Sequence, residues 1–336
     1  FVLFGRSDAG ADFERLIFVQ DRTCGLRAVI VLHSLRRGPA FGGIRRHRYE
    51  NEESAIFEAF ELAETMTLKC ALAGLPAGGG KSVILDHSGL DMEDIYKSMG
   101  RAVEGLAGTY ICGPDVGTGE GELDHIREET NFVSPAVNVP AAATAKGLVA
   151  GLRGIFRVAE DNETLAGKHF LIQGLGSVGM DLAERLIKLD GRVTGCDINE
   201  QACEKARQMG VEIIPHDAAY TIACDVFMPC ALGGVISGPE AKAAPWKAVC
   251  GAANNQFTTI DAAKNLFERG IYVAPDLVVN AGAVIEGVYT FREGQTPQTR
   301  ERVDEAIEKI ADRTEKILRV SLEREEPPLA VARFKA

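Results

Sequence analysis

The chain has 336 residues, of which 46% are hydrophobic and 25% are charged, and this predicts a globular protein of two domains. Its net charge of −11 argues against nucleic-acid binding, because an acidic surface repels phosphate groups. No uninterrupted apolar stretch reaches the roughly 18 residues that a membrane helix needs, so no membrane association is expected.

The first part of the sequence predicts strands and helices around a short glycine run. The helix over 52–68 is indicated by apolar residues at helical spacing, and the glycines lie at Gly78–Gly80, just before a strand. The predicted strands cover 16–20, 28–33, 82–85 and 109–112, and the helices cover 52–68 and 91–106. The Pro-rich, uncharged segment 134–143 is interpreted as the domain boundary.

From residue 144 onward, predicted strands alternate with predicted helices. The strands cover 169–173, 192–196, 226–228, 248–250 and 272–273, and the principal helices cover 144–158, 178–189 and 301–322. Such alternation implies a parallel sheet with helices on both faces. We therefore predict an α/β protein with a first domain over 1–138, a second over 139–321 and a C-terminal segment over 322–336.

A glycine motif follows the strand that ends at Gln173. Residues 174–179 read GLGSVG and match GxGxxG between a strand and a helix. Glycines at these positions permit a tight turn and a close backbone approach, so that a pyrophosphate can bind at the helix N-terminus. The motif predicts a Rossmann dinucleotide-binding unit, with contacts from Gly174, Gly176, Ser177, Val178 and Gly179.

The next strand ends in Asp197, 23 residues after Gly174. An acid at this place accepts hydrogen bonds from ribose hydroxyls and repels a 2′-phosphate. Ile198 and Asn199 add no positive charge, so NAD is favoured over NADP. The alternatives are a glycine turn that binds nothing and a Rossmann unit that binds S-adenosylmethionine.

The first domain carries two lysines in apolar surroundings. Lys81 lies between three glycines and an apolar strand, and Lys69 lies between Leu68 and Cys70. Lysines are ordinarily surface cations, but desolvation at these places would lower their pKa from about 10.4. Two lysines in one pocket would also lower each other's pKa, and Asp115 would hold the cations together and exchange protons with an amine.

Amino-acid oxidation needs such groups. One cation fixes the substrate carboxylate, and a second group handles protons when water adds to the imine that hydride loss leaves behind. We therefore hypothesise that Lys81 and Asp115 are the catalytic groups of such an oxidation.

Several other classes are disfavoured. GGGKS suggests a phosphate-binding P-loop, but Leu75 stands where that loop needs glycine, and a strand follows it instead of a helix. Eight cysteines form no CxxC pair and six histidines form no HExxH pattern, so neither a disulfide framework nor a metal site is expected. The N-terminus lacks the pattern of a secretory signal, and a cytoplasmic protein is expected.

Together these segments resemble the glutamate/leucine/phenylalanine/valine dehydrogenase family, on its leucine–phenylalanine–valine side. The segments that carry the resemblance occur in family order along nearly the whole chain. They are GPAFGGIR (38–45), MTLK (66–69), LPAGGGKSVI (75–84), GPDVGT (113–118), ETNFV (129–133), QGLGSVG (173–179), PCALGG (229–234), GAANNQ (251–256) and APDLVVNAG (274–282).

The resemblance implies NAD-dependent oxidative deamination of an L-amino acid to a 2-oxo acid and ammonia, and the reverse amination. It implies an N-terminal substrate domain, a C-terminal Rossmann domain, a catalytic cleft between them, a last segment that returns to the first domain, and a homo-oligomer. It makes Lys69 the ligand of the substrate carboxylate, Lys81 the general acid–base and Asp115 its partner. The other implied substrate contacts are Phe41, Gly42, Gly43, Met66, Asn254 and Val284, and the other cofactor contacts are Thr144, Asp197, Ile198, Cys230, Ala231, Leu232 and Asn254.

The side-chain pocket should involve Phe41, Gly113, Val284 and Gly287, which favours a bulky apolar substrate such as phenylalanine, leucine, tryptophan or valine. Three residues depart from the family pattern: Lys146, Ala283, which stands where glycine is usual, and Glu286. Glu286 would favour a polar or cationic substrate if it pointed inward; otherwise it faces solvent or pairs with a base. Lys146 is the one extra cation that glutamate would need. A dehydrogenase for glutamate or another polar amino acid, and a non-catalytic NAD-binding regulatory protein, stay as alternatives.

Overall fold

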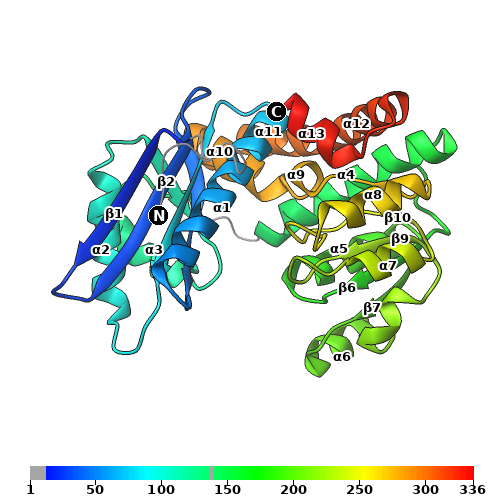
Figure 1. Ribbon diagram of the computed structural model, residues 1–336, viewed down its shortest axis with the longest axis horizontal. Helices are drawn as coiled ribbons and strands as arrows, with labels where there is room; N and C mark the ends of the chain where they lie inside the picture. Colours follow the sequence, from blue (N-terminus) through cyan, green and yellow to red (C-terminus); the bar gives the residue numbers. More distant parts are fainter. Residues whose placement is uncertain (1–12, 136–139) are drawn as a thin grey trace. The chain divides into compact units, whose positions relative to one another are not determined.

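The computed structural model describes residues 13–135 and 140–336, and its contacts divide the chain into two units (Figure 1). The first unit comprises Phe1–Val137 and Gly287–Thr299, and the second comprises Asn138–Glu286 and Arg300–Ala336. The predicted boundary at 138/139 lies outside the described residues. Each unit is described below by itself.

The first unit is built on a five-stranded mixed sheet. Its strand order is β1-β2-β4-β3-β5, with β1, β2 and β4 antiparallel and β4, β3 and β5 parallel. The strands are β1 (Arg15–Asp21), β2 (Leu26–Ser34), β3 (Ala40–His47), β4 (Gly78–Leu85) and β5 (Tyr110–Gly113), and the helices are α1 (Glu52–Leu72), α2 (Met92–Glu104) and α3 (Glu120–Arg127). The sequence did not predict β3 and α3, and it treated the glycines that begin β4 as a break.

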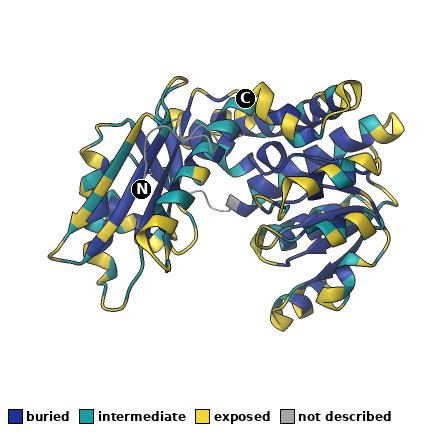
Figure 2. Cartoon of the chain, in the orientation of Figure 1, coloured by how far each residue is buried: buried dark blue, intermediate teal, exposed yellow. Residues whose placement is uncertain are grey.

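The two faces of this sheet pack against different helices. Ile30 and Ile84 lie in one apolar cluster with residues of α2 and α3, whereas Val31 and Val83 lie in another with residues of α1. Successive side chains of a strand point to opposite faces, so Lys81 shares the α1 face with Val83. Figure 2 shows β2 as mostly buried, whereas the edge strand β1 and the outward sides of the helices are intermediate or exposed.

Helix α1 lies close to the sheet because its buried stripe is made of alanines. Its N-terminus is capped by Asn51, whose side chain accepts a hydrogen bond from the Ser54 backbone nitrogen. Ala55, Ala59 and Ala63 follow at four-residue spacing and are fully buried. Small side chains on this stripe bring the rest of α1, including Lys69 near its C-terminal end, down onto β4.

The second unit contains a six-stranded sheet in the order β11-β10-β9-β6-β7-β8, in which every paired strand is parallel. The strands are β6 (His169–Gln173), β7 (Arg192–Cys196), β8 (Glu212–Ile213), β9 (Cys224–Pro229), β10 (Trp246–Val249) and β11 (Tyr272–Val273). The chain runs outward from β6 in one direction through β7 and β8, and in the other through β9 to β11. This is the doubly wound order, with its switch point beside β6. The predicted α/β fold with a Rossmann sheet is confirmed.

The helices of the second unit surround this sheet, and α10 and α11 are shared between the two units. They are α4 (Pro140–Glu160), α5 (Ser177–Lys188), α6 (Glu200–Gln208), η1 (His216–Tyr220), α7 (Gly238–Ala243), α8 (Ile260–Glu268), α9 (Asp276–Val279), α10 (Gly282–Glu293), α11 (Pro297–Glu308), α12 (Ile310–Arg324) and α13 (Pro328–Lys335). Within the described residues, no helix combines the length and apolar character required to cross a bilayer.

The C-terminal part differs from the prediction in two ways. The single helix predicted over 301–322 is two helices, α11 and α12, which meet at Lys309. Residues 322–336, expected to return to the first domain, belong to the second unit, where Val331 and Ala332 of α13 are fully buried and Arg324 of α12 lies 5.3 Å from the Phe334 ring. The part of the C-terminal half grouped with the first unit is Gly287–Thr299.

Candidate active site

A buried ion pair joins Lys81 of β4 to Asp115, which follows β5. The Nζ of Lys81 lies 2.8 Å from Oδ2 of Asp115, and their side chains are only 6% and 20% exposed. Burial lowers the pKa of Lys81 below its usual 10.5, although Asp115 opposes that shift. A lysine whose pKa is lowered in this way can give and take a proton nearer to neutral pH.

Arg45 of β3 is a second cation at the same carboxylate. Its Nε lies 2.8 Å from the same Oδ2 of Asp115. Burial by itself raises the pKa of Asp115, but Lys81 and Arg45 outweigh it and hold that pKa below its usual 3.8. Arg45 also lowers the pKa of Lys81, so it is a cation beside this lysine that the sequence did not predict. The sequence analysis named the segment that contains Arg45 and gave this residue no role.

The other end of Arg45 is held from α1. Its Nη1 lies 2.5 Å from Oε1 of Glu58, and Oε2 of Glu58 accepts a hydrogen bond from the Tyr49 hydroxyl. The five side chains therefore form one chain of contacts: Tyr49, Glu58, Arg45, Asp115 and Lys81. The turn that carries Asp115 is closed by two backbone hydrogen bonds between Asp115 and Thr118.

The predicted substrate residues of the first unit lie on adjoining elements. Lys69 and Met66 lie on α1, where Lys69 is 8% exposed and Met66 is half-buried. Gly42 and Gly43 lie on β3 beside the Asp115 turn. A Cβ at Gly43 would come within 2.8 Å of the Asp115 Cβ and 2.5 Å of the Pro114 carbonyl oxygen. Glycine is therefore needed at position 43 for Asp115 to approach β3.

Three predicted pocket residues also lie in the first unit. Phe41 is 4% exposed and makes an edge contact with Phe291, with ring centroids 5.6 Å apart. Gly113 and Gly287 face the same side chain, because a Cβ at either would lie within 3.4 Å of Ser134. Ser134 carries no signal in the sequence that would have predicted this position. The fourth predicted residue, Val284, is half-buried on α10 in the second unit.

The glycine motif forms the predicted turn between β6 and α5. Gly174 has φ of +99°, and a Cβ there would lie 2.7 Å from the Ala231 nitrogen. A Cβ at Gly179 would lie 2.0 Å from the Gly174 carbonyl oxygen, so this glycine lets α5 approach the strand. Nothing lies within 4 Å of the Cβ position at Gly176, the N-cap of α5. This open space at a helix N-terminus, with Ser177 and Val178 in the first turn, fits a pyrophosphate.

Asp197 lies beside this turn, directly after β7. Its Oδ2 accepts a hydrogen bond of 2.7 Å from the Leu175 nitrogen, and its Oδ1 accepts one of 2.8 Å from the Asn199 nitrogen. These bonds fix the carboxylate at the carboxyl edge of the sheet, next to the open space at Gly176. Ile198 is 91% exposed beside it. An apolar side chain held in water at this place fits a planar base.

The remaining predicted cofactor residues lie in the same unit. Cys230 and Ala231 follow β9, and the Cys230 nitrogen donates to the Gln173 carbonyl oxygen at 2.7 Å. Burial raises the pKa of Cys230 to about 12, so its thiol stays protonated. Asn254 is exposed, and its Oδ1 accepts a 2.9 Å hydrogen bond from Nδ2 of the buried Asn280. Thr144 is 9% exposed on α4.

The two charged residues that depart from the family pattern, Glu286 and Lys146, are engaged in ion pairs. Glu286 is 6% exposed, and its Oε1 lies 2.5 Å from Nη1 of Arg300. Lys146 lies 2.5 Å from Asp304. Of the outcomes that the sequence left open for Glu286, the structure shows pairing with a base.

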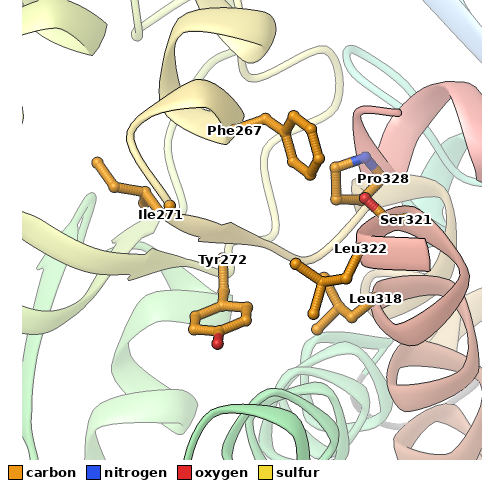
Figure 3. Close-up of a pocket in the computed structure, with 8 residues that line it drawn as sticks. Phe267, Ile271, Tyr272, Leu318, Ser321, Leu322 and Pro328 are labelled. Atoms are coloured by element: carbon orange, nitrogen blue, oxygen red, sulfur yellow. The ribbon is translucent and has the colours of Figure 1, made fainter. Parts of the chain in front are cut away.

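A separate apolar pocket of about 90 Å³ lies in the second unit (Figure 3). It is lined by Phe267 of α8, Ile271 and Tyr272 at the start of β11, Leu318 and Leu322 of α12, and Pro328 of α13, and Figure 3 shows the Phe267 ring directed toward Pro328. None of the residues that line it is charged. In the described part of the chain, no group of three or more His, Cys, Asp or Glu side chains is placed to hold a metal ion.

Most of the chain is similar to known dehydrogenases. Residues 14–132 match the family model described as "Glu/Leu/Phe/Val dehydrogenase, dimerisation domain", and residues 197–333 match "Glutamate/Leucine/Phenylalanine/Valine dehydrogenase". Leucine dehydrogenase of Bacillus subtilis is 37% identical, over 92% of this chain and 86% of that protein. Phenylalanine dehydrogenase of Lysinibacillus sphaericus is 36% identical, over 82% of this chain and 76% of that protein. The crystal structure of L-tryptophan dehydrogenase from Nostoc punctiforme superposes with a TM-score of 0.84 at 30% identity, over 96% and 94%.

These likenesses and the two α/β units define an amino-acid dehydrogenase, and that prediction is confirmed. The chain belongs to the Glu/Leu/Phe/Val dehydrogenase family. The roles of the individual site residues stay predictions.

Proposed function

We propose that this protein catalyses oxidative deamination of a bulky apolar L-amino acid, with NAD as hydride acceptor, and the reverse reductive amination. An amino acid, NAD⁺ and water yield a 2-oxo acid, ammonium, NADH and a proton. The observation that carries the proposal is the buried Lys81–Asp115 pair, with Arg45 on the same carboxylate oxygen. The leucine, phenylalanine and tryptophan dehydrogenases to which the chain is similar support the apolar substrate class.

The residues of the first unit then divide the work. Lys69 binds the substrate carboxylate. Asp115, kept ionised by its two cations, accepts a hydrogen bond and a proton from the substrate amine. Lys81, with its lowered pKa, removes a proton from the water that attacks the imine carbon and returns it to the leaving amine. Phe41, Gly42, Gly43 and Met66 are proposed to complete the substrate contacts of this unit, and Asn254 and Val284 of the second unit are proposed as further substrate contacts.

In the second unit, NAD accepts the hydride when it is bound. The open N-terminus of α5 at Gly176 supports binding of its pyrophosphate there, with contacts from Gly174, Ser177, Val178 and Gly179. Asp197 accepts hydrogen bonds from the ribose hydroxyls, and Ile198 covers the base. Thr144, Cys230, Ala231 and Asn254 are proposed as the other cofactor contacts.

Replacing Asp197 with asparagine is expected to relax the choice of cofactor. Asparagine keeps the size of the side chain and removes the negative charge that repels a 2′-phosphate. The ratio of kcat/KM with NAD to that with NADP should fall at least tenfold, about 1.4 kcal/mol. Asp261→Asn, at the exposed start of α8, is the matched control and should leave the ratio unchanged. An unchanged ratio in Asp197→Asn would contradict the proposed role.

Replacing Gly113 with alanine is expected to narrow the substrate pocket. The added methyl would lie 3.4 Å from the Ser134 Cβ, an ordinary contact, so the fold should tolerate it. The kcat/KM for phenylalanine or tryptophan should fall about tenfold relative to that for valine, because one methyl group in a pocket changes binding by ~1–3 kcal/mol. Equal loss for large and small substrates would argue against Gly113 as a wall of the pocket.

A panel of amino acids tests the function itself. At about pH 10, where α-amino groups are largely uncharged, NADH should form with leucine, phenylalanine, tryptophan or valine. Glutamate should react poorly, because Lys146 and Glu286, on which a polar substrate would depend, are already paired within the protein. Measurable NAD binding without NADH formation from any amino acid would favour a regulatory protein.

We also propose that the protein forms a homo-oligomer and is located in the reducing environment of the cytoplasm. The description of the matching N-terminal family model as a dimerisation domain supports the first. All eight cysteines are free thiols, which supports a cytoplasmic location. Light scattering of the purified protein at several concentrations tests the oligomer.

A further inference from the structure

The two oxygens of Asp115 have different surroundings. Oδ2 lies 2.8 Å from both Lys81 Nζ and Arg45 Nε. Oδ1 makes no hydrogen bond or ion pair with the described residues, and the side chain is 20% exposed. One oxygen is therefore fixed by the protein, and the other is left to meet a ligand.

Arg45 is placed in the sheet so that it can fix Oδ2 of Asp115. Strand β3 lies between β4 and β5 in the sheet, and Ile44 points into the cluster formed with α2 and α3. Arg45, the next residue, therefore shares the α1 face with Lys81. A guanidinium group presents donors in a fixed planar fork and stays charged at every working pH.

The fork spans two carboxylates. Nε contacts Asp115 and Nη1 contacts Glu58, which comes from α1 and also accepts from the Tyr49 hydroxyl. Burial and the nearby Glu58 carboxylate raise the pKa of Tyr49, so this hydroxyl stays a donor. Glu58 thus fixes the guanidinium from the side opposite Asp115.

We propose that Arg45 and Glu58 are positioning residues for the proposed deamination: Glu58 fixes Arg45, and Arg45 fixes Oδ2 of Asp115, so that Oδ1 faces the substrate amine and Lys81 is free to lose its proton. The inference rests on the proposed function. Its basis is that Arg45 keeps Asp115 neutralised when Lys81 becomes uncharged. Without Arg45, loss of the Lys81 proton would leave a buried carboxylate uncompensated.

The charges around Lys81 determine in which direction each variant should shift the pKa of this lysine. The titratable groups on the elements packed against its strand include Glu58, Glu64 and Lys69 of α1, Arg45 and His47 of β3, His33 of β2, Tyr110 of β5, and Asp115. Tyr110 lies in the cluster on the other face, and burial raises its pKa well above 10, so it stays neutral. Besides burial and Asp115, Arg45 lowers the pKa of Lys81 and Glu58 raises it. Removal of the Arg45 charge should therefore move the pH dependence of catalysis to higher pH. Removal of the Glu58 charge should move it to lower pH.

The test compares Arg45→Gln with Glu58→Gln through the pH dependence of kcat/KM for deamination. Arg45→Gln should move the acid limb to higher pH by about one unit, and Glu58→Gln should move it to lower pH by up to one unit. Both variants should also lose at least tenfold in kcat, because Asp115 is less well oriented. A role in folding alone would not shift the two limbs in opposite directions.

Two further variants isolate charge from geometry. Arg45→Lys keeps the positive charge but lacks the fork, so the acid limb should return toward that of the wild type while kcat stays low. Arg101→Gln is the matched control, because Arg101 also pairs with two carboxylates, Asp21 and Glu129, but on α2 at the other face. It should leave both the limb and kcat unchanged.

A direct titration of Lys81 separates this inference from the proposed function. The rate of acetylation of Lys81 by traces of acetic anhydride, followed by peptide mass spectrometry, reports its protonation without any turnover. Opposite shifts in the two folded variants support the inference, even if no amino acid proves to be a substrate. Shifts in the same direction, or none, in variants with wild-type thermal unfolding would overturn it.

Discussion

Replacing Lys81 with methionine is expected to lower kcat for deamination about a thousandfold. Methionine fills a similar volume in this buried position and removes the proton carrier, and general acid–base groups contribute roughly 10²- to 10⁴-fold. Because burial lowers the pKa of Lys81, the wild-type rate should rise with pH as this lysine loses its proton, below the usual 10.5. That limb should be absent from the pH–rate profile of the variant.

Two controls sharpen this expectation. Lys69→Met should act chiefly through KM for the amino acid, because Lys69 is proposed to bind the substrate carboxylate and not to move protons. Lys81→Ala should recover part of its activity when a small primary amine is added to fill the vacated space. A Lys81→Met enzyme that kept more than a tenth of the wild-type kcat would sink the proposed role.

The second unit is largely predictable from sequence because its signals are local. The bounds of β6, β7 and β11 agree with the predicted ones, since each strand is a short apolar run between turn residues. The glycine turn was predictable because the backbone conformation and the close contacts that require glycine at 174, 176 and 179 arise within six residues of chain. The break at Lys309 was not, because the amphipathic pattern continues from α11 into α12.

The first unit was harder to predict because its key contacts join distant parts of the chain. Arg45 begins the run RRHRYE, which has the composition of a solvated loop. The strand β3, which ends within this run, was therefore not predicted. Its partner Asp115 lies 70 residues away, and the register of β3 against β4 and β5 brings them together. Sequence indicated which groups the chemistry needs, but not which cation would stand beside Lys81.

Replacing Asp115 with asparagine is expected to lower kcat/KM for deamination about a thousandfold. The variant keeps the shape of the side chain, so Arg45 and Lys81 still meet one oxygen, but that oxygen is no longer anionic. The substrate ammonium then loses both its counter-ion and its proton acceptor. Because Asp115 raises the pKa of Lys81, the residual acid limb should move to lower pH, whereas Lys81→Met removes that limb.

Stability gives a second, independent measure of the same change. The pKa of Asp115 is depressed in the folded protein, so its stabilisation is present above the unfolded value of 3.8 and is lost as pH falls through the lower folded value. Asp115→Asn should therefore cost about 2 kcal/mol at pH 7, a limited amount because Lys81 can release its proton. The difference in unfolding free energy from wild type should shrink as the pH is lowered below 3.8. A difference that stayed constant down to pH 2 would show that the carboxylate contributes through its shape and not through its charge.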